Sequence, residues 1–300
     1  MRLRIIGIAL VLALGAAACR PHPGGYHRVR AATIADRLRR YAGDDAARQA
    51  SLAGLFEEAG CRGDRLELQP VDNADAPNVI CTLPGETDGV LVVGAHFDRV
   101  DVGDGVADNW SGASLLPSLY QSLGRTPRRH TFLFIGFSDE EEGYVGSKFY
   151  ADTLDAARRA SIRAMVNLDT LGLTSARVWE RDSSPPLVEL LHAVARARGL
   201  PLDACNIDDY GDSDGSSFKK HGIPVLTLHS VTPGTWDILH SEKDRFAAVG
   251  QSDYYDTYNL VAAFLAALDA APPAGAEGAG PGSTPPRDNP AGGNLPETTP

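Results

Sequence analysis

Short apolar segments alternate with longer amphipathic stretches along most of the chain from residue 64 onward. The apolar segments, which are rich in β-branched residues and predicted to be strands, lie at 64–70, 77–82, 89–95, 131–137, 162–168, 176–179 and 223–228. The amphipathic stretches, predicted to be helices, lie at 111–123, 145–159, 185–199, 213–221 and 251–270. Because strands and helices take turns along the sequence, the pattern predicts an α/β fold built around one sheet.

Two of the apolar segments, 90–93 and 132–135, contain no polar residues. This is typical of central strands that helices cover on both faces. Upstream, residues 30–59 have a helical pattern with a break near 43–45. Neither a repeat nor a linker interrupts the chain after this point, so we expect a single folded domain at 30–271.

The N-terminal segment has the pattern of an export signal. Arg2 and Arg4 precede an apolar run at 5–14 that is too short to span a bilayer. The end of this segment, Ala16-Ala17-Ala18-Cys19, is similar to a bacterial lipoprotein signal, in which the cysteine is lipidated. We therefore expect a signal peptide at 1–18, a linker at 19–29 and a periplasmic or outer-membrane lipoprotein whose only membrane contact is a lipid at Cys19. Plain cleavage after Ala18 and secretion is the alternative.

Composition sets further limits on the partners. Residues 272–300 contain 8 Pro and 6 Gly and are predicted to be a disordered tail. The formal charge of the 300-residue chain is -11, which argues against nucleic acid as a partner because phosphate binding needs a basic surface. After Cys19 three cysteines remain, Cys61, Cys81 and Cys205. An odd number leaves at least one free, and a Cys61–Cys81 disulfide is one possible pairing in an exported protein.

Polar residues concentrate directly after three of the predicted strands. The segment 89–95 leads into His96-Phe97-Asp98, 131–137 into Ser138-Asp139-Glu140-Glu141-Glu142-Gly143, and 162–168 into Asp169. In an open α/β sheet, ligands bind beyond the carboxyl ends of strands, so these residues can converge. Asp98 can accept the ring N–H of His96 and leave the other ring nitrogen for a metal. Several carboxylates at one edge favour a cation or a raised pKa.

Each of these motifs alone also fits a structural role, as a turn, a helix cap or a surface neighbour. Taken in order, they resemble the co-catalytic zinc aminopeptidases of the bacterial leucyl aminopeptidase type. The motifs that carry the resemblance are His96-Phe97-Asp98, Asp108-Asn109-Trp110-Ser111-Gly112, Glu140-Glu141-Glu142-Gly143-Tyr144-Val145-Gly146-Ser147, Asn167-Leu168-Asp169, Tyr210-Gly211-Asp212-Ser213-Asp214 and His240-Ser241-Glu242-Lys243-Asp244. The resemblance covers roughly residues 64–270.

The resemblance implies a three-layer α/β/α fold with a mostly parallel mixed sheet, the phosphorylase/hydrolase-like fold of zinc exopeptidases. It also implies two Zn²⁺ ions. His96 and Asp169 match the ligands of one ion, Glu141 and His240 match those of the other, and Asp108 matches the bridging carboxylate. Glu140 matches the general base, and Tyr210 the hydroxyl that donates to the oxyanion. Imidazole and carboxylate are ligands that zinc prefers.

The implied reaction is hydrolysis of the first peptide bond of substrates with a free N-terminus. Two zinc ions a few ångströms apart lower the pKa of a shared water and polarise the carbonyl. Glu140 then takes a proton from this water and gives it to the leaving amine. The amino terminus of a peptide is a cation, which an acidic site attracts.

Three rivals remain beside the aminopeptidase. Glutaminyl cyclases are similar in the His-x-Asp, Glu-Glu and final His motifs but use one zinc, and the short segment 141–147 favours the peptidase. Carboxypeptidases share the dinuclear scaffold. A non-catalytic binding module is disfavoured because every matched ligand is present.

Three residues outside the matched ligand set depart from the family pattern or have no place in it. Trp110 replaces a small residue and is either a substrate platform or part of the core. His229 is expected to be a buried, hydrogen-bonded histidine, with a specificity pocket as the second interpretation. Gly215 follows Asp214, where relatives often carry a His.

Overall fold

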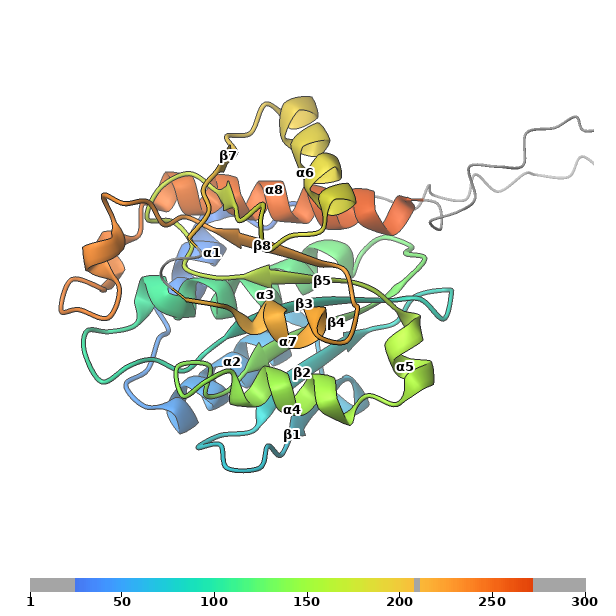
Figure 1. Cartoon of the computed structure of the whole chain (residues 1–300), viewed down its shortest axis with the longest axis horizontal. Coiled ribbons are helices and arrows are strands. Elements are labelled where there is room, and N and C mark those ends of the chain that lie inside the picture. Colours follow the sequence, from blue (N-terminus) through green and yellow to red (C-terminus); the bar gives the residue numbers. More distant parts are fainter. Residues whose placement is uncertain (1–24, 208–210, 272–300) are drawn as a thin grey trace, which may run out of the picture. The chain divides into compact units, whose positions relative to one another are not determined.

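The structure is a computed structural model that describes residues 25–207 and 211–271. The expected signal peptide, most of the linker, Tyr210 and the tail lie outside these residues. Within them, an eight-stranded mixed sheet has the order β1-β2-β4-β3-β5-β8-β6-β7 (Figure 1). The strands are β1 (Leu66–Gln69), β2 (Asn78–Leu83), β3 (Val90–His96), β4 (Thr131–Phe137), β5 (Ile162–Leu168), β6 (Arg177–Val178), β7 (Asp203–Ala204) and β8 (Val225–His229). The α/β fold predicted from the alternating pattern is confirmed.

The four central strands β4, β3, β5 and β8 are parallel. The pairs β1·β2, β2·β4 and β6·β8 are antiparallel, so the sheet is mixed around a parallel centre. Because parallel strands end at the same edge, this centre brings the residues that follow β3, β4 and β5 to one place. Among the described residues, no helix combines the length and the apolar character needed to cross a membrane.

Helices cover both faces of the sheet (Figure 1). They are α1 (Ala31–Leu38), α2 (Asp45–Ala59), α3 (Ser111–Leu123), α4 (Val145–Thr153), α5 (Ala156–Ser161), α6 (Pro185–Arg198), α7 (Asp214–Lys219) and α8 (Gln251–Ala270). One hydrophobic cluster joins the sheet to α1, α2, α3, α6 and α8, and a smaller cluster joins its other face to α4 and α7. The sheet is therefore the middle of three layers, as the resemblance implied.

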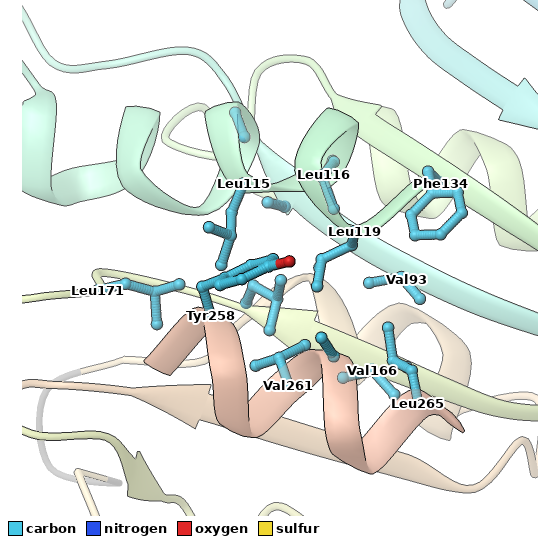
Figure 2. Close-up of a cluster of buried hydrophobic side chains, with 14 of the residues drawn as sticks. Val93, Leu115, Leu116, Leu119, Phe134, Val166, Leu171, Tyr258, Val261 and Leu265 are labelled. Carbon is cyan, nitrogen blue, oxygen red and sulfur yellow. The ribbon is translucent and has the colours of Figure 1, made fainter. Parts of the chain in front are cut away.

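Alternation along the central strands supplies both clusters. In β3, Val93 packs toward the larger cluster and Val92 toward the smaller one. In β4, Phe134 and Ile135 divide in the same way. Figure 2 shows the larger cluster, where leucines of α3 meet Tyr258, Val261 and Leu265 of α8 over these strands. Both faces of each central strand are buried, and for this reason these strands are continuously apolar and do not alternate between apolar and polar residues.

Helix boundaries follow local capping. The break expected near 43–45 is confirmed, because Asp44 caps α2 by accepting the N–H of Ala47 at 2.8 Å. The single helix expected at 145–159 is wrong. The chain leaves the helical conformation at Leu154, and Asp155 caps a new helix by accepting the N–H of Arg158. The two-residue strand β7 is also absent from the pattern-based prediction, since two residues establish no period.

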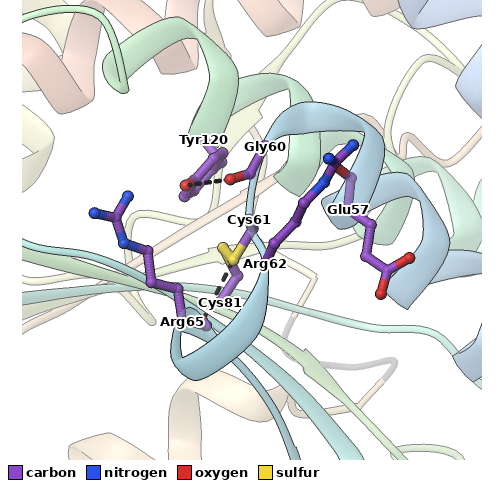
Figure 3. Close-up of a disulfide and its surroundings, with 7 residues drawn as sticks. All are labelled: Glu57, Gly60, Cys61, Arg62, Arg65, Cys81 and Tyr120. Carbon is purple, nitrogen blue, oxygen red and sulfur yellow. Dashed lines mark hydrogen bonds between the residues drawn. A yellow bond between two sulfur atoms is a disulfide. The ribbon is translucent and has the colours of Figure 1, made fainter.

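A disulfide joins Cys61, two residues after the end of α2, to Cys81 in β2 (Figure 3). Both cysteines are fully buried, and Cys205 is free. The pairing that the sequence left open is therefore the one the structure contains. It ties the end of a helix to the sheet across 20 residues of chain.

We expect replacement of both Cys61 and Cys81 by Ser to lower the free energy of unfolding by about 3 kcal/mol. The cross-link restricts the unfolded chain, and a loop of this length has an entropic effect of that order. Urea unfolding followed by circular dichroism measures the change, with the free Cys205→Ser as the matched control. An equal midpoint for the double variant and the wild type would contradict the prediction.

Candidate metal centre

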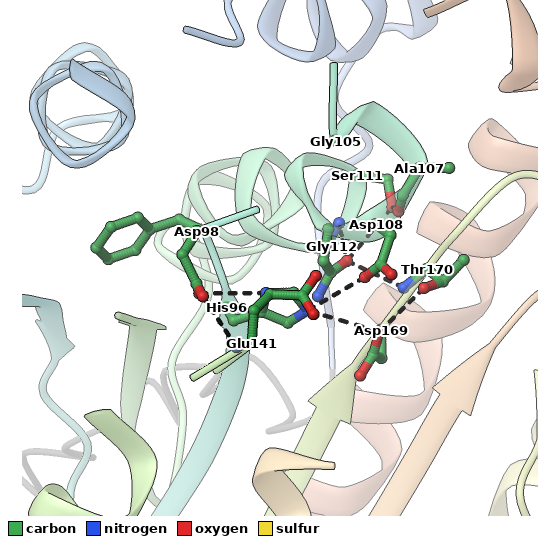
Figure 4. Close-up of polar contacts among 12 residues, drawn as sticks. His96, Asp98, Gly105, Ala107, Asp108, Ser111, Gly112, Glu141, Asp169 and Thr170 are labelled. Atoms are coloured by element: carbon green, nitrogen blue, oxygen red, sulfur yellow. Dashed lines mark hydrogen bonds and ion pairs between the residues drawn. The ribbon is translucent and has the colours of Figure 1, made fainter. Parts of the chain in front are cut away.

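The residues that follow the central strands meet at the carboxyl edge of the sheet (Figure 4). His96 is the last residue of β3, and Glu140 and Glu141 lie in the turn after β4. Asp169 follows β5 directly. Asp108 lies at a non-helical kink in the segment Val106–Trp110 that leads into α3, and His240 lies in the loop after β8. Elements far apart in the sequence thus supply one cluster.

Asp108 lies between the two histidines. Its Oδ1 is 3.3 Å from Nε2 of His96, and its Oδ2 is 3.3 Å from Nε2 of His240. Nε2 of His96 is also 3.9 Å from Oδ1 of Asp169, and Nε2 of His240 is 3.1 Å from Oε2 of Glu141. Each oxygen of Asp108 therefore faces a different histidine, and each histidine has a second carboxylate beside it.

These contacts define two groups of potential metal ligands that share one residue. In each group, the ligand atoms all lie within 4.8 Å of one another. The groups are His96, Asp108 and Asp169, and Asp108, Glu141 and His240. The described residues contain one further such group, His96, Glu140 and Glu141, which overlaps them. A carboxylate that offers one oxygen to each of two groups is suited to bridging two cations.

Asp98 contacts the ring nitrogen of His96 that does not face Asp108. Its Oδ1 lies 3.3 Å from Nδ1 of His96, and its Oδ2 accepts the N–H of Glu141 at 3.0 Å. Burial raises the pKa of Asp98, but the contact with His96 and the N–H donors of the 140–141 turn outweigh burial and lower the pKa. An ionised Asp98 favours the tautomer of His96 that carries its proton on Nδ1, which leaves Nε2 free for a metal.

Opposite charges also shift the pKa values of the facing residues. Burial lowers the pKa of His96, yet the negative charge of Glu140 and the contact with Asp108 outweigh burial and raise it well above its usual range. Contacts with Asp108 and Glu141 raise the pKa of His240 to about 10. Burial raises the pKa of Asp108, but the contacts with His240 and His96 outweigh burial and lower the pKa below its usual range. The carboxylates of the cluster therefore favour a positive charge on the groups that they face at this edge of the sheet.

Glu140 lies in the same cavity but outside the two groups that share Asp108. Burial, together with the charges of Asp214 and Asp169, raises its pKa well above the usual range, although His96 acts in the opposite direction. A carboxylate with raised proton affinity beside a metal site is suited to accept and return a proton.

A cavity of about 400 Å³ opens onto these residues. The cavity is lined by the residues of the two groups, by Glu140 and by Asp212, and also by the larger side chains of Tyr144, Val231, Trp236 and Leu239. Of the described residues that line the cavity, none is a Lys or Arg.

Backbone strain concentrates around the cavity. The described non-glycine residues with positive φ are Asn73, Asp139, Tyr144, Thr170 and His240. All except Asn73 lie in or beside the cluster. Such conformations cost free energy and tend to persist where the site requires them.

The donor set fits zinc. Zinc binds imidazole nitrogen and carboxylate oxygen, and each group here offers one imidazole and two carboxylates. In addition, the buried Oε1 of Glu141 has no hydrogen-bond partner among the described residues. A buried carboxylate oxygen without a donor is costly unless a cation is beside it.

The structure brings together His96, Asp98, Asp108, Glu140, Glu141, Asp169 and His240, which are all the predicted site residues except Tyr210. Tyr210 lies outside the described residues. Trp110 is fully buried beside Arg48, so it belongs to the core and is no substrate platform. His229 is buried, donates from Nε2 to the carbonyl of Cys205 and accepts the N–H of Val231, as expected.

Two residues that support the site, Asn109 and Arg48, have no role in the prediction from the sequence. The amide of Asn109 donates to the carbonyl of Leu168 and accepts the N–H of Thr170, which joins the turn of Asp108 to the end of β5. The guanidinium of Arg48, on α2, donates to the carbonyls of Phe97 and Gly105. Asn109 carried a signal because it follows Asp108 in a motif, whereas Arg48 looks like a surface residue of an amphipathic helix.

Comparisons with known proteins show which families and folds the chain is similar to. The model of peptidase family M28 matches residues 78–265. The chain is 32% identical over 170 residues to leupeptin-inactivating enzyme 1 of Streptomyces exfoliatus, a match that covers 55% of this chain and 38% of that protein. Curated relatives are thus matched over about a third to just under half of their length.

Two solved structures share the fold. The zinc aminopeptidase BSAP of Bacillus subtilis aligns with a TM-score of 0.59 at 24% identity, over 64% of this chain and 50% of that chain. The glutaminyl cyclase of an Acidobacteriales bacterium aligns with a TM-score of 0.70 at 18% identity, over 83% and 98%.

Proposed function

Because this chain belongs to peptidase family M28, we propose that it is a zinc-dependent aminopeptidase that removes the first residue of peptides. The observation that carries the proposal is the pair of ligand groups that share Asp108, with Glu140 in the same cavity. Relatives named as aminopeptidases and the zinc aminopeptidase BSAP support it.

Two zinc ions fit the two groups. His96 and Asp169 would hold one ion, Glu141 and His240 would hold the other, and Asp108, which faces both histidines, would be shared between them. When bound, the ions supply Lewis-acid polarisation of the scissile carbonyl and a lowered pKa for the attacking water. Asp98 keeps Nε2 of His96 directed into the site.

Glu140 handles the protons. Its carboxylate accepts one proton from the attacking water as the new carbon–oxygen bond forms. It then returns this proton to the peptide nitrogen as the carbon–nitrogen bond breaks, so that a free amino acid and a shortened peptide leave. The burial that raises its pKa suits both halves of this transfer. A hydroxyl of Tyr210 as the oxyanion donor stays a prediction.

Charge decides which end of the peptide enters. A free amino terminus is cationic, and Asp212 adds an acid at the wall of the cavity beyond the ligand groups. A carboxypeptidase needs a cation for the terminal carboxylate of its substrate, and within 25–207 and 211–271 no Lys or Arg lines the cavity. The lining therefore favours an aminopeptidase over a carboxypeptidase.

A glutaminyl cyclase is the second candidate, since one shares the fold at 83% coverage of this chain. One zinc is enough for that reaction. Because cyclases share the His-x-Asp motif, the presence of His96 does not separate the two reactions, whereas the short segment 141–147 favours the peptidase.

We expect the purified protein to bind two zinc ions per chain and to release leucine from leucyl-p-nitroanilide, with no cyclisation of glutaminyl peptides. Elemental analysis and the two assays, run side by side before and after dialysis against a chelator, measure this. One zinc with cyclisation alone would replace the proposal by the cyclase. A protein that binds no zinc and is inactive in both assays would indicate a binding module.

We further propose that the protein works outside the cytoplasm, either as a lipoprotein anchored at Cys19 or as a secreted enzyme after cleavage at Ala18. The buried Cys61–Cys81 disulfide supports this, because disulfides persist in oxidising compartments.

A further inference from the structure

A buried carboxylate holds the turn that carries the bridging residue. Asp244 is only 2% exposed, and its side chain accepts three backbone N–H groups. Oδ1 accepts from Val106 at 3.0 Å and from Ala107 at 2.7 Å, and Oδ2 accepts from Asp108 at 3.0 Å. Both oxygens are thus used, and the third bond falls on the backbone of Asp108 itself.

The segment that contains Asp244 also contains His240. The main chain of Asp244 accepts the N–H of Asp104 at 2.8 Å, which adds a fourth hydrogen bond between this segment and the loop before Asp108. Gly103 lies so close that a Cβ there would clash with the carbonyl of Ser241. Segment 240–244 and loop 103–108 are therefore packed as one unit.

This unit fixes two ligands relative to each other. Oδ2 of Asp108 faces Nε2 of His240, while Oδ1 faces Nε2 of His96 on β3. A displaced turn would move both oxygens of Asp108, and so would disturb both ligand groups. Displacement of His240 alone would disturb only the group with Glu141.

We propose that Asp244 is a positioning residue that sets both metal sites at once, by fixing the backbone of Asp108 against the segment of His240. The inference rests on the proposed function, because it assumes that the two groups bind zinc. Asp244 belongs to neither ligand group, yet by this inference it contributes to the affinity of the protein for each zinc ion.

The substitution Asp244→Asn tests this with little change of shape. An amide keeps one acceptor oxygen, and its NH₂ cannot accept the remaining N–H. We expect the affinity for both zinc ions to fall 10- to 100-fold in parallel, the effect typical of residues that orient metal ligands. Titration of the metal-free protein with Zn²⁺ against a chelating dye measures both steps. Visible absorption of the Co²⁺-loaded protein reports the coordination geometry and should change.

Two variants calibrate the result. Glu242→Gln removes a carboxylate from the same segment, but Glu242 is exposed and pairs with Arg245, so both affinities should stay unchanged. His240→Ala removes a ligand of one group and should weaken mainly one step. If Asp244→Asn lacks a cooperative thermal transition without metal, Asp244→Glu takes its place. It keeps both acceptors but is one methylene longer, so it should shift the turn and weaken both steps.

Two outcomes separate the inference from the proposed function. If the wild type binds two zinc ions and the folded Asp244 variant binds both with unchanged affinity and an unchanged Co²⁺ spectrum, the positioning role is wrong. If the wild type binds no zinc at all, the proposed function fails first.

Discussion

Glu140→Gln should retain two zinc ions and lose most turnover. Glutamine has nearly the same shape as glutamate but cannot take a proton from water, and a positioned general base contributes roughly 10²- to 10⁴-fold. Glu140 lies outside the two groups that share Asp108, so zinc content should stay that of the wild type. We expect kcat for leucyl-p-nitroanilide to fall by this factor, with KM changed much less.

Glu142→Gln is the matched control. It lies two residues further in the same acidic turn, is exposed and does not line the cavity, so its kcat should equal that of the wild type. Zinc analysis of both variants shows whether any loss of rate comes from lost metal. Wild-type turnover in Glu140→Gln would remove Glu140 from the proton transfer.

Most of the fold could be predicted from the sequence, because the period of the hydrophobic residues is directly linked to their burial. The segment 131–137 is β4 without a shift of either end, since both of its faces are buried. Prediction failed at 145–159, where amphipathic character continues across a helix end. The boundary between α4 and α5 is marked in the sequence only by the N-cap residue Asp155, and an Asp inside an amphipathic stretch is equally consistent with a surface position in one helix.

For the site, the ligands and Asp98, which orients His96, could be predicted from the sequence, whereas the contacts of the other supporting residues could not. His96 and Asp169 end strands whose order along the chain can be read, so their meeting at one sheet edge follows from the fold. Asp244 and Arg48 form hydrogen bonds with backbone groups of loops that are distant in the sequence. Every residue has such backbone groups, so the sequence does not indicate which of them a side chain will bind. Contacts of this kind appear only when the chain is folded.

Asp108→Ala should have the largest effect on the metal, the loss of both zinc ions. Asp108 is shared by the two groups, so its removal leaves each of these groups with one histidine and one carboxylate, His96 with Asp169 and His240 with Glu141. Two ligands per ion are fewer than the three protein ligands typical of catalytic zinc. We expect less than one zinc per chain after dialysis, and no measurable leucyl release.

The control for this variant is Asp101→Ala, which removes an exposed acid of the preceding loop and should keep two zinc ions. Thermal unfolding of the metal-free proteins separates metal loss from loss of fold. In the wild type, added zinc should raise the unfolding temperature, because a ligand that binds only the native state stabilises it. In Asp108→Ala, the same zinc should leave this temperature nearly unchanged. Two tightly bound zinc ions in this variant would show that Asp108 is no bridge.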